Sequence, residues 1–339
     1  MSKCSVKGVA PRGIICALPA NRVENDYFAG RFDEKTIKDV TALTGVSTRY
    51  VAAPDQTAGD LCLAAAERLL EDLQWPRESV DALIFVSQTP DQRMPATACI
   101  LHGRLGLSKN CQAFDVGLGC SGYVYGTWLV AALMAVGVRR VLLLAGDTSS
   151  RMINPVDRST AMLFGDAGSA TAFEHDPDAA PAYFDLGTDG SGANFLTVPG
   201  GGFRPSDKQD PKADTLHMDG SAVFGFTIST VPKLIKAILV QADLTKDNTD
   251  LFALHQANRF ILQHIGKKLG LSAEQLPINI DKFGNTSSAS IPLLICTDMA
   301  KRITTQPMTV LMAGFGVGLS WGAAIFKDVQ LQCASVIEI

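Results

Sequence analysis

Aromatic and charged residues are scarce in this 339-residue chain, at 7% and 19% of its composition. There is no basic tract and no alternation of basic with aromatic residues, and the net charge is −4, so we expect no nucleic-acid partner. The eight cysteines form no C-x-x-C pair and have no spaced histidine pair beside them, so we expect no metal site. Unpaired cysteines scattered through a long chain are typical of a reducing compartment, which predicts a cytoplasmic protein.

Long, clean apolar runs are also missing, so we expect no membrane-spanning segment. The run GIICALPA near the N-terminus is short and holds a proline, which favours a first strand or hairpin over a secretory signal. Hydrophobic residues make up 47% of the chain, and its 30 glycines favour closely packed α/β layers.

A weak internal repeat runs through the chain and predicts two duplicated halves, residues 1–180 and 181–339. Each half reads as strand, helix, strand, turn, helix, strand, which predicts mostly parallel sheets with the chemistry beyond the carboxyl ends of the strands. The matched segments are 80–90 with 249–259, 102–107 with 265–271, 112–122 with 277–288, and 142–147 with 310–316.

The stretch FDVGLGCSGYVYG, residues 114–126, allows two interpretations. Gly117, Gly119 and Gly122 fit the dinucleotide pattern G-x-G-x-x-G, with Asp147 as a late candidate for the ribose-binding acid of an oxidoreductase. Alternatively, the glycines form a sharp turn that mounts Cys120 as a nucleophile at the start of an apolar helix. The free N–H groups of that helix would favour the reactive thiolate.

The repeat favours the second interpretation, because it places Asn285 at the position related to Cys120, just after an equivalent strand. His255 also follows a strand of the second half, so the three side chains would converge near the axis that relates the halves. The nucleotide pattern, in contrast, has no glycine counterpart in the second half.

The chain resembles the beta-ketoacyl-acyl-carrier-protein synthase III branch of the thiolase-fold condensing enzymes. The resemblance covers roughly residues 8–327 and rests on segments that occur in family order: FDVGLGCSGYVYG, NPVDRSTAMLFGDAGSA, HMDGSAVFGFT, LHQANRFI, GNTSSASIP and GFGVGLSWG. It implies a five-layered α-β-α-β-α fold, a homodimer joined through the strand around 113–116, and a role in fatty-acid-type or specialised acyl biosynthesis. It implies no cofactor, since acyl-CoA or acyl-carrier protein is the substrate.

By the same resemblance, Cys120, His255 and Asn285 form the catalytic triad of a ping-pong reaction. Cys120 would take an acyl group from a thioester, and malonyl on an acyl carrier protein would then lose carbon dioxide and attack it. His255 and Asn285 would donate hydrogen bonds to the enolate. The backbone N–H groups of Cys120 and Val317 would hold the oxyanion of acyl transfer.

Further residues receive roles from the resemblance or from their charge: Lys267, Lys268 and Arg259 form a small basic group that either docks an acidic carrier protein or is a solvated helix face. The substrate-binding set is Arg151, Asn258, Phe224, Met94 and Phe315. The carrier-docking set is Arg259, Lys267 and Lys268. Several family contacts with the CoA nucleotide are replaced, at Asp39, Leu43, Gly225 and Phe260. We therefore expect a donor other than ordinary short acyl-CoA.

Two other functions stay open at this point. An acyltransferase on the same fold would pass the acyl group of Cys120 to an alcohol or amine, with His255 as base. A regulatory subunit would lack one or more triad members. We expect Asp166 to be a turn or core hydrogen-bonding residue, and the tail LQCASVIEI has no predicted role.

Overall fold

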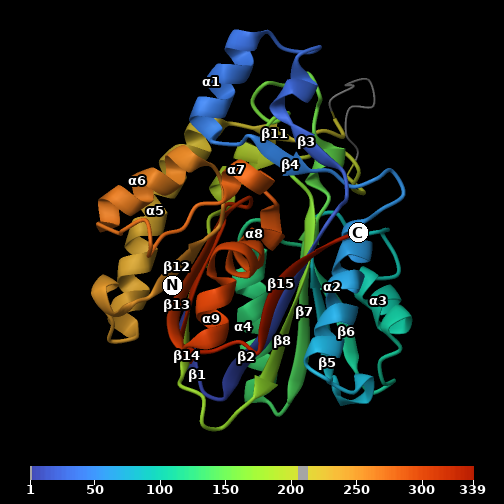
Figure 1. Cartoon of the computed structure of the whole chain (residues 1–339), viewed down its shortest axis with the longest axis vertical. Coiled ribbons are helices and arrows are strands. Elements are labelled where there is room, and N and C mark those ends of the chain that lie inside the picture. The colour runs from blue at the N-terminus through green and yellow to red at the C-terminus, as the bar shows by residue number, and fades with distance from the viewer. Residues whose placement is uncertain (1, 205–212) are drawn as a thin grey trace.

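Two β-sheets enclose a central layer of helices in the computed structural model, which describes residues 2–204 and 213–339 (Figure 1). The strands of the first sheet run in the order β15 (Cys333–Glu338), β2 (Val9–Leu18), β8 (Ala167–His175), β7 (Arg140–Asp147), β5 (Ala82–Val86), β6 (Gln112–Val116). Those of the second run in the order β1 (Ser2–Val6), β9 (Ala182–Thr188), β14 (Ser320–Val329), β13 (Met308–Gly316), β12 (Leu251–Leu254).

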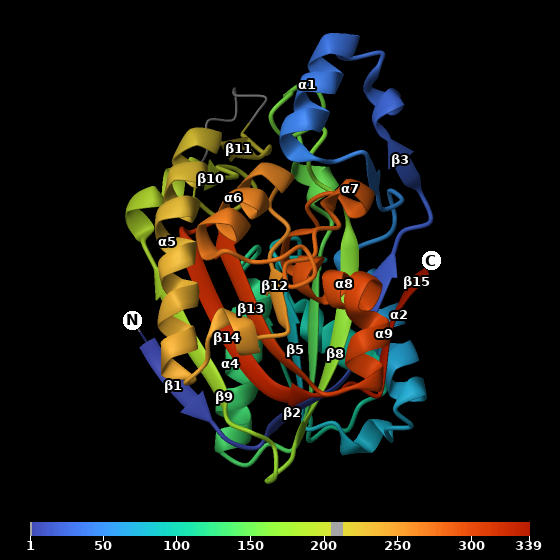
Figure 2. The same cartoon turned by 60° about the vertical axis from the view of Figure 1, so that its left-hand side comes forward.

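Helices form three layers around these sheets (Figures 1 and 2). The outer face of the first sheet carries α2 (Ala58–Asp72) and α3 (Thr97–Leu105). The centre holds α4 (Gly122–Ala135), α8 (Ser290–Leu294) and α9 (Ala300–Thr305). The outer face of the second sheet carries α5 (Gly220–Gln241) and α6 (Arg259–Leu269). The predicted five-layered α-β-α-β-α order is therefore confirmed.

Smaller elements close the end of the molecule at which the central strands finish. They are the ribbon of β3 (Arg22–Glu24) and β4 (Thr48–Tyr50), the pair β10 (Leu196–Thr197) and β11 (His217–Met218), and the helices α1 (Glu34–Thr44) and α7 (Ile280–Phe283). Local sequence explains several boundaries. Thr57 and Asp60 form a capping box at the start of α2, and Gly45 and Gly270 end α1 and α6 in the left-handed conformation.

The sheets are mixed, so the expectation of mostly parallel sheets is wrong. The β5–β6, β5–β7, β12–β13 and β15–β2 pairs are parallel, whereas β7–β8, β2–β8, β13–β14, β9–β14 and β1–β9 are antiparallel. Hairpin connections such as that between β13 and β14 need only a short loop, whereas parallel pairs need a crossover.

The two ends of the chain cross between the sheets. The first predicted strand is present, but β1 joins the second sheet while β2 joins the first. The C-terminal tail forms β15, which pairs in parallel with β2, and the Ile339 carbonyl accepts a hydrogen bond from the Ala20 N–H. The tail thus adds an edge strand to the first sheet.

The strand expected at the start of segment 277–288 is absent, which corrects the repeat at this point. The segment instead forms the short helix α7, whose Asp281 carbonyl accepts a hydrogen bond from Ser47 beside β4. Pro277 has no N–H to give to a sheet, and the Asn279 N–H donates to the Gln256 side chain instead. Within this described segment, no strand therefore precedes Asn285.

Among the described residues, one helix, α5, is long and apolar enough by length and composition to cross a membrane, contrary to the sequence expectation. In the fold it lies along the second sheet (Figure 2), with Val231, Leu234, Ile235 and Ile238 buried against β13 and β14. Its apolar face is therefore explained by packing within the protein.

Candidate active site

Cys120 lies in a tight turn between β6 and α4, one residue before the helix cap at Ser121. The turn is pressed against its surroundings. A methyl group on Gly122 would come within 2.5 Å of the Val86 side chain, and one on Gly119 would meet Gln88 and the Ser287 hydroxyl. Glycine is therefore needed at 119 and 122 for close packing of the turn that carries Cys120.

Strand β13 passes directly beside this turn. A methyl group on Gly316 would lie 2.9 Å from the Cys120 sulfur, and one on Gly314 would lie 2.8 Å from the Cys120 carbonyl oxygen. The backbone N–H groups of Val317 and Cys120 both lie at the thiol and act to lower its pKa. These are the two donors expected for the oxyanion.

His255 follows β12 and is 1% exposed. Its Nδ1 lies 2.7 Å from the Ser290 hydroxyl of α8, and its ring meets Phe315 edge-on, with 5.6 Å between ring centroids. Burial lowers the pKa of His255 to about 3, so the imidazole is neutral at physiological pH.

Asn285 is held by its own backbone and by its side chain. It forms an isolated parallel bridge with Phe164, and its Oδ1 accepts a hydrogen bond of 2.9 Å from the Ser287 N–H. Because a main-chain N–H can only donate, this contact fixes the orientation of the amide. The Nδ2 group makes a long contact of 3.4 Å with the Ala257 carbonyl.

A cavity of about 90 Å³ joins the three predicted side chains: Cys120, His255 and Asn285 all line it. Cys120 belongs to the first half of the chain, and the other two belong to the second. Phe224, Phe315 and Asn258, which the sequence predicts to bind substrate, line the same cavity. Asn258 also caps α6, because its side chain accepts a hydrogen bond from the Ile261 N–H.

The expected thiolate is not supported, because burial raises the pKa of the Cys120 thiol to about 11. The Val317 and Cys120 N–H groups and the Ser287 hydroxyl oppose this rise, but loss of contact with water outweighs them. The nearby charge of Asp147 raises the pKa of this thiol as well. The resting pair is therefore a neutral thiol and a neutral imidazole.

Three other residues predicted to bind substrate or carrier do not line the cavity. Met94 is 76% exposed and does not line the cavity. The Arg151 guanidinium donates to the carbonyls of Ala53, Pro54 and Gln56, so it holds a loop. Arg259 donates to the Gly45 carbonyl at the end of α1.

Lys268 has a structural partner as well. Pro232 lies inside α5 and has no N–H for the Ile228 carbonyl four residues earlier, and the Lys268 ammonium donates to that carbonyl at 2.9 Å. Within residues 2–204 and 213–339, the side-chain ammonium of Lys267 makes no hydrogen bond or ion pair. Of the three predicted carrier-docking residues, Lys267 is thus the one free to bind another molecule.

Asp147 has a role that sequence reasoning missed. It is completely buried at the end of β7, where it accepts hydrogen bonds from Gln88 and from the Ser288 N–H and hydroxyl. It therefore joins the first half of the chain to the segment that carries Asn285. A polar residue at the end of an apolar strand was the available signal.

Asp166 accepts from Ala52 and Ser150, which agrees with its predicted core role.

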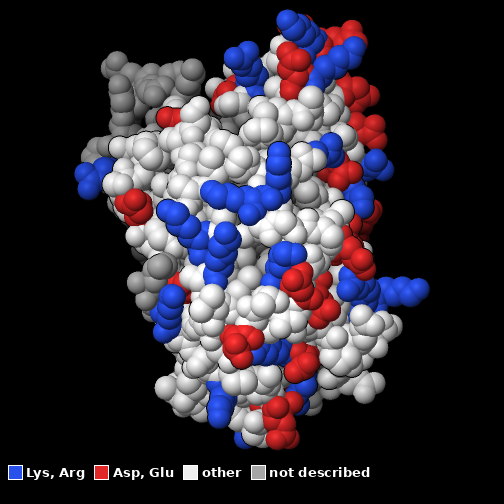
Figure 3. All heavy atoms as spheres, turned by 90° about the vertical axis from the view of Figure 1, so that its left-hand side faces the viewer, with Lys and Arg blue, Asp and Glu red and all other residues white. Residues whose placement is uncertain are grey.

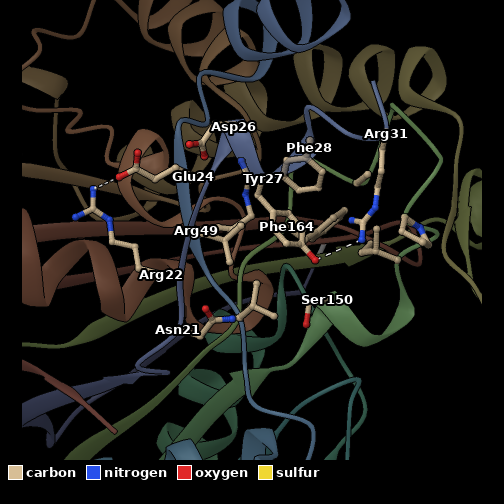
Figure 4. Close-up of a pocket in the computed structure, with 15 residues that line it drawn as sticks. Asn21, Arg22, Glu24, Asp26, Tyr27, Phe28, Arg31, Arg49, Ser150 and Phe164 are labelled. Carbon is tan, nitrogen blue, oxygen red and sulfur yellow. Dashed lines mark hydrogen bonds and ion pairs between the residues drawn. The ribbon is translucent and has the colours of Figure 1, made fainter. Parts of the chain in front are cut away.

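A second and larger cavity, of about 830 Å³, lies between the β3–β4 ribbon and the segment 150–164 (Figure 4). Phe164 lines both cavities and separates this one from the triad. Arg49 is 1% exposed, donates to the Asn25 side chain and lies 4.9 Å from the centre of the Phe28 ring. Burial lowers its pKa to about 10, so it stays charged at neutral pH.

In the described ranges no group of three or more His, Cys, Asp or Glu could hold a metal ion.

Comparison with known proteins decides between the open functions. Residues 114–190 match a family profile described as 3-oxoacyl-[acyl-carrier-protein] synthase III, and residues 239–328 match the profile of its C-terminal part. A beta-ketoacyl-[acyl-carrier-protein] synthase III from Caldanaerobacter subterraneus is 35% identical, over 85% of this chain and 88% of its own. The chain belongs to the 3-oxoacyl-acyl-carrier-protein synthase III family.

Solved structures agree with this assignment. A 3-oxoacyl-(acyl-carrier protein) synthase from Burkholderia xenovorans LB400 is 46% identical with a TM-score of 0.97, covering 100% of this chain and 99% of the other. A 3-oxoacyl-(acyl carrier protein) synthase III from Pseudomonas aeruginosa PAO1 is 31% identical with a TM-score of 0.85, covering 96% and 99%. The enzyme is thus an acyltransferase of the condensing type, associated with fatty acid biosynthesis. The family assignment favours condensation over the oxidoreductase, regulatory-subunit and simple acyl-transfer interpretations.

Proposed function

We propose that Cys120, His255 and Asn285 carry out a two-step condensation in which Cys120 holds the acyl group between the steps. The observation that supports this most directly is the shared cavity, in which a thiol, a neutral imidazole and an oriented carboxamide meet beside two backbone N–H donors.

In the first step, the Cys120 sulfur attacks the carbonyl of an acyl thioester and the bond to the carrier sulfur breaks. The thiol proton ends on the departing carrier thiol, so no proton is gained or lost overall. The oxyanion that forms is held by the N–H groups of Cys120 and Val317. Each such donor typically contributes ~3–4 kcal/mol to transition-state stability.

In the second step, a malonyl thioester loses carbon dioxide, and the resulting enolate attacks the acyl group on Cys120. The products are a β-ketoacyl thioester and the thiolate of Cys120, which takes up one proton. Nε2–H of His255 and Nδ2–H of Asn285 donate to the enolate oxygen. That tautomer requires Nδ1 to accept a hydrogen bond, and the Ser290 hydroxyl at 2.7 Å can supply it.

The low pKa of His255 suits this second role. A neutral imidazole keeps Nε2–H as a hydrogen-bond donor throughout the physiological range and does not compete for protons. The Gln256 N–H lies 3.5 Å from the Ser290 oxygen, on the accepting side of that hydroxyl. This contact favours donation by Ser290 toward His255.

The family implies acyl-carrier-protein or acyl-CoA substrates, and the surface favours an acidic carrier protein. Figure 3 shows lysine and arginine side chains gathered over the face formed by α5 and α6. These helices carry Lys233, Lys236, Arg259, Lys267 and Lys268 and no acidic residue. Docking there would weaken as salt rises.

The residues at the mouth of the cavity favour an acyl donor that is not bound through a nucleotide. Phe224 lines the cavity and stacks on Phe260, with 5.3 Å between ring centroids, and Phe260 is half exposed. Leu43, also exposed, occupies a position where the family has a cation. We propose a donor carried by a protein, because an apolar mouth binds a pantetheine arm better than nucleotide phosphates.

We further propose a cytoplasmic homodimer built from the duplicated halves 1–180 and 181–339. Strand β6 forms an edge of the first sheet, so its outer backbone groups lie open to pairing with a second copy. The exposed Met94 would then contact the partner subunit. Size measurement in solution tests the dimer, and a charged substitution at half-buried Ala113 in β6 should disrupt it.

The test of the catalytic proposal is to incubate the protein with a panel of acyl-carrier and acyl-CoA thioesters and to read the mass of the Cys120 peptide. Acylation of Cys120 and release of carbon dioxide from malonyl-carrier are both expected. Cys120→Ala should abolish acylation, whereas His255→Ala and Asn285→Ala should keep acylation and lose condensation. Wild-type turnover by Cys120→Ala would refute the proposal.

A further inference from the structure

Two buried hydroxyl groups connect the nucleophile turn to the loop between β13 and β14. Ser121 follows Cys120 and is 0% exposed, and Ser320 begins β14 and is 2% exposed. Their Oγ atoms lie 2.6 Å apart, and the Ser320 Oγ lies 2.7 Å from the Val317 carbonyl oxygen. Both distances are those of good O–H···O hydrogen bonds.

The direction of these bonds follows from counting protons. A serine hydroxyl has one hydrogen to donate, and a carbonyl oxygen can only accept. Ser320 must therefore donate its hydrogen to Val317, which leaves its lone pairs to accept from Ser121. The chain of donors runs from Ser121 to Ser320 to the carbonyl of Val317, and we call it the hydroxyl relay.

The loop that receives the relay is short and rich in glycine. Residues 317–319 connect the two strands, and Gly316 and Gly318 have positive φ angles of 156° and 134°. Leu319 exchanges two main-chain hydrogen bonds with Asp189, which fixes the far side of the loop. The hydroxyl relay links this loop to the nucleophile turn, in addition to the contact between the Val317 N–H and the Cys120 thiol.

Glycine on both sides of Val317 permits rotation of the adjoining peptides, and any rotation would move the N–H that faces Cys120. The Val317 carbonyl lies in the peptide after the Val317 Cα, and the Val317 N–H lies in the peptide before it. We propose that the hydroxyl relay, by holding the carbonyl side, fixes the orientation of Val317 and so keeps its N–H pointed at the position where the oxyanion of acyl transfer forms. The inference rests on the proposed function of Cys120 and Val317. Ser121 and Ser320 are positioning residues, because they act through Val317 and do not touch the acyl group.

The relay predicts how strongly each of three variants slows a single step, the acylation of Cys120. Ser320→Ala removes the bond to Val317 and should slow single-turnover acylation of Cys120 about 10- to 100-fold, at most the effect of losing an oxyanion donor. Ser121→Ala leaves that bond in place and should slow acylation about 3- to 10-fold, since it only weakens the Ser320 donor. The double variant should equal Ser320→Ala, because Ser121 acts only through Ser320.

The decarboxylation of malonyl-carrier in the absence of an acyl donor separates positioning from general damage. That step uses His255 and Asn285, so it should stay within about twofold of wild type in all three variants. Ser169→Ala is the matched control, because it removes a buried hydroxyl that donates to the Ala145 carbonyl at the same 2.7 Å. It should leave acylation unchanged.

Three results would overturn the relay: wild-type acylation in Ser320→Ala, an equal loss in both steps, or a double variant whose loss is the product of the single losses. If wild-type protein accepts none of the donors, the proposed function fails, and alkylation of Cys120 by iodoacetamide still tests the relay. Ser320→Ala should then alkylate about threefold more slowly at each pH, equivalent to half a unit of pKa. Unchanged alkylation would refute the relay.

Discussion

The protonation state of Cys120 gives the sharpest test of how this site works. Burial raises the pKa of the thiol to about 11 from an ordinary value of 9.0, a difference of two units or ~3 kcal/mol against the thiolate. At pH 7.5 roughly one molecule in 3000 would then carry a thiolate. His255 does not offset this, because its own pKa is lowered to about 3.

The assay is the rate of Cys120 alkylation by iodoacetamide between pH 6 and 10, read from the mass of the Cys120 peptide so that exposed Cys99 is resolved separately. The sign is fixed by the chemistry, since only the thiolate reacts. The rate should rise about tenfold per pH unit across the whole range without a plateau.

A plateau with a midpoint near pH 7 would refute this reasoning. It would mean that a thiolate–imidazolium pair exists at rest, and that the N–H groups at the sulfur outweigh burial. A rise that continues to pH 10 would instead show that deprotonation accompanies the arrival of the thioester, and the resting enzyme would then resist oxidation at this cysteine.

Three further predictions follow from contacts around the site. Gly316→Ala should slow acylation by more than about 100-fold in a folded protein, because its methyl group would lie 2.9 Å from the Cys120 sulfur, and wild-type kinetics would contradict that geometry. Lys268→Ala should lower the free energy of unfolding in urea by ~1 kcal/mol through its lost helix bond, while Lys267→Ala should leave stability unchanged and weaken binding of the carrier in low salt. The reverse pattern would show that Lys268 serves docking. Arg151→Ala should cost ~1–3 kcal/mol of stability without changing the ratio of acyl-CoA to acyl-carrier kcat/KM, and a selective loss with acyl-CoA would restore its predicted role in nucleotide binding.

Much of this enzyme was determined by local sequence. The glycines around Cys120 need close packing whatever the rest of the chain does, and the apolar run after it can only form a buried helix. The order of apolar and polar segments predicted that His255 follows a strand, which the structure shows, whereas Asn285 follows a short helix and itself forms an isolated bridge. These features depend on side-chain size and on periodicity, which are written in short stretches of residues.

Other features were decided by contacts between distant residues. Segment 277–283 forms no strand: the N–H of Asn279 is taken by the Gln256 side chain, and a helix begins at Ile280, which no local pattern reveals. The tail became β15 because β2 has an open edge beside it. Likewise, Arg151 and Lys268 have the charge of ligand-binding residues but donate to carbonyls of the fold.

The charge on the sulfur also depends on the whole structure. The helix start near Cys120 favours a thiolate when considered alone, and the sequence could show only this effect on the pKa of the thiol. The opposing effect, which raises this pKa, is loss of water from a site closed by β13, α4 and the segment carrying Asn285. These elements come together only in the folded chain. Sequence therefore determined which atoms meet in the cavity, and the tertiary structure decided their protonation, because desolvation depends on every neighbour at once.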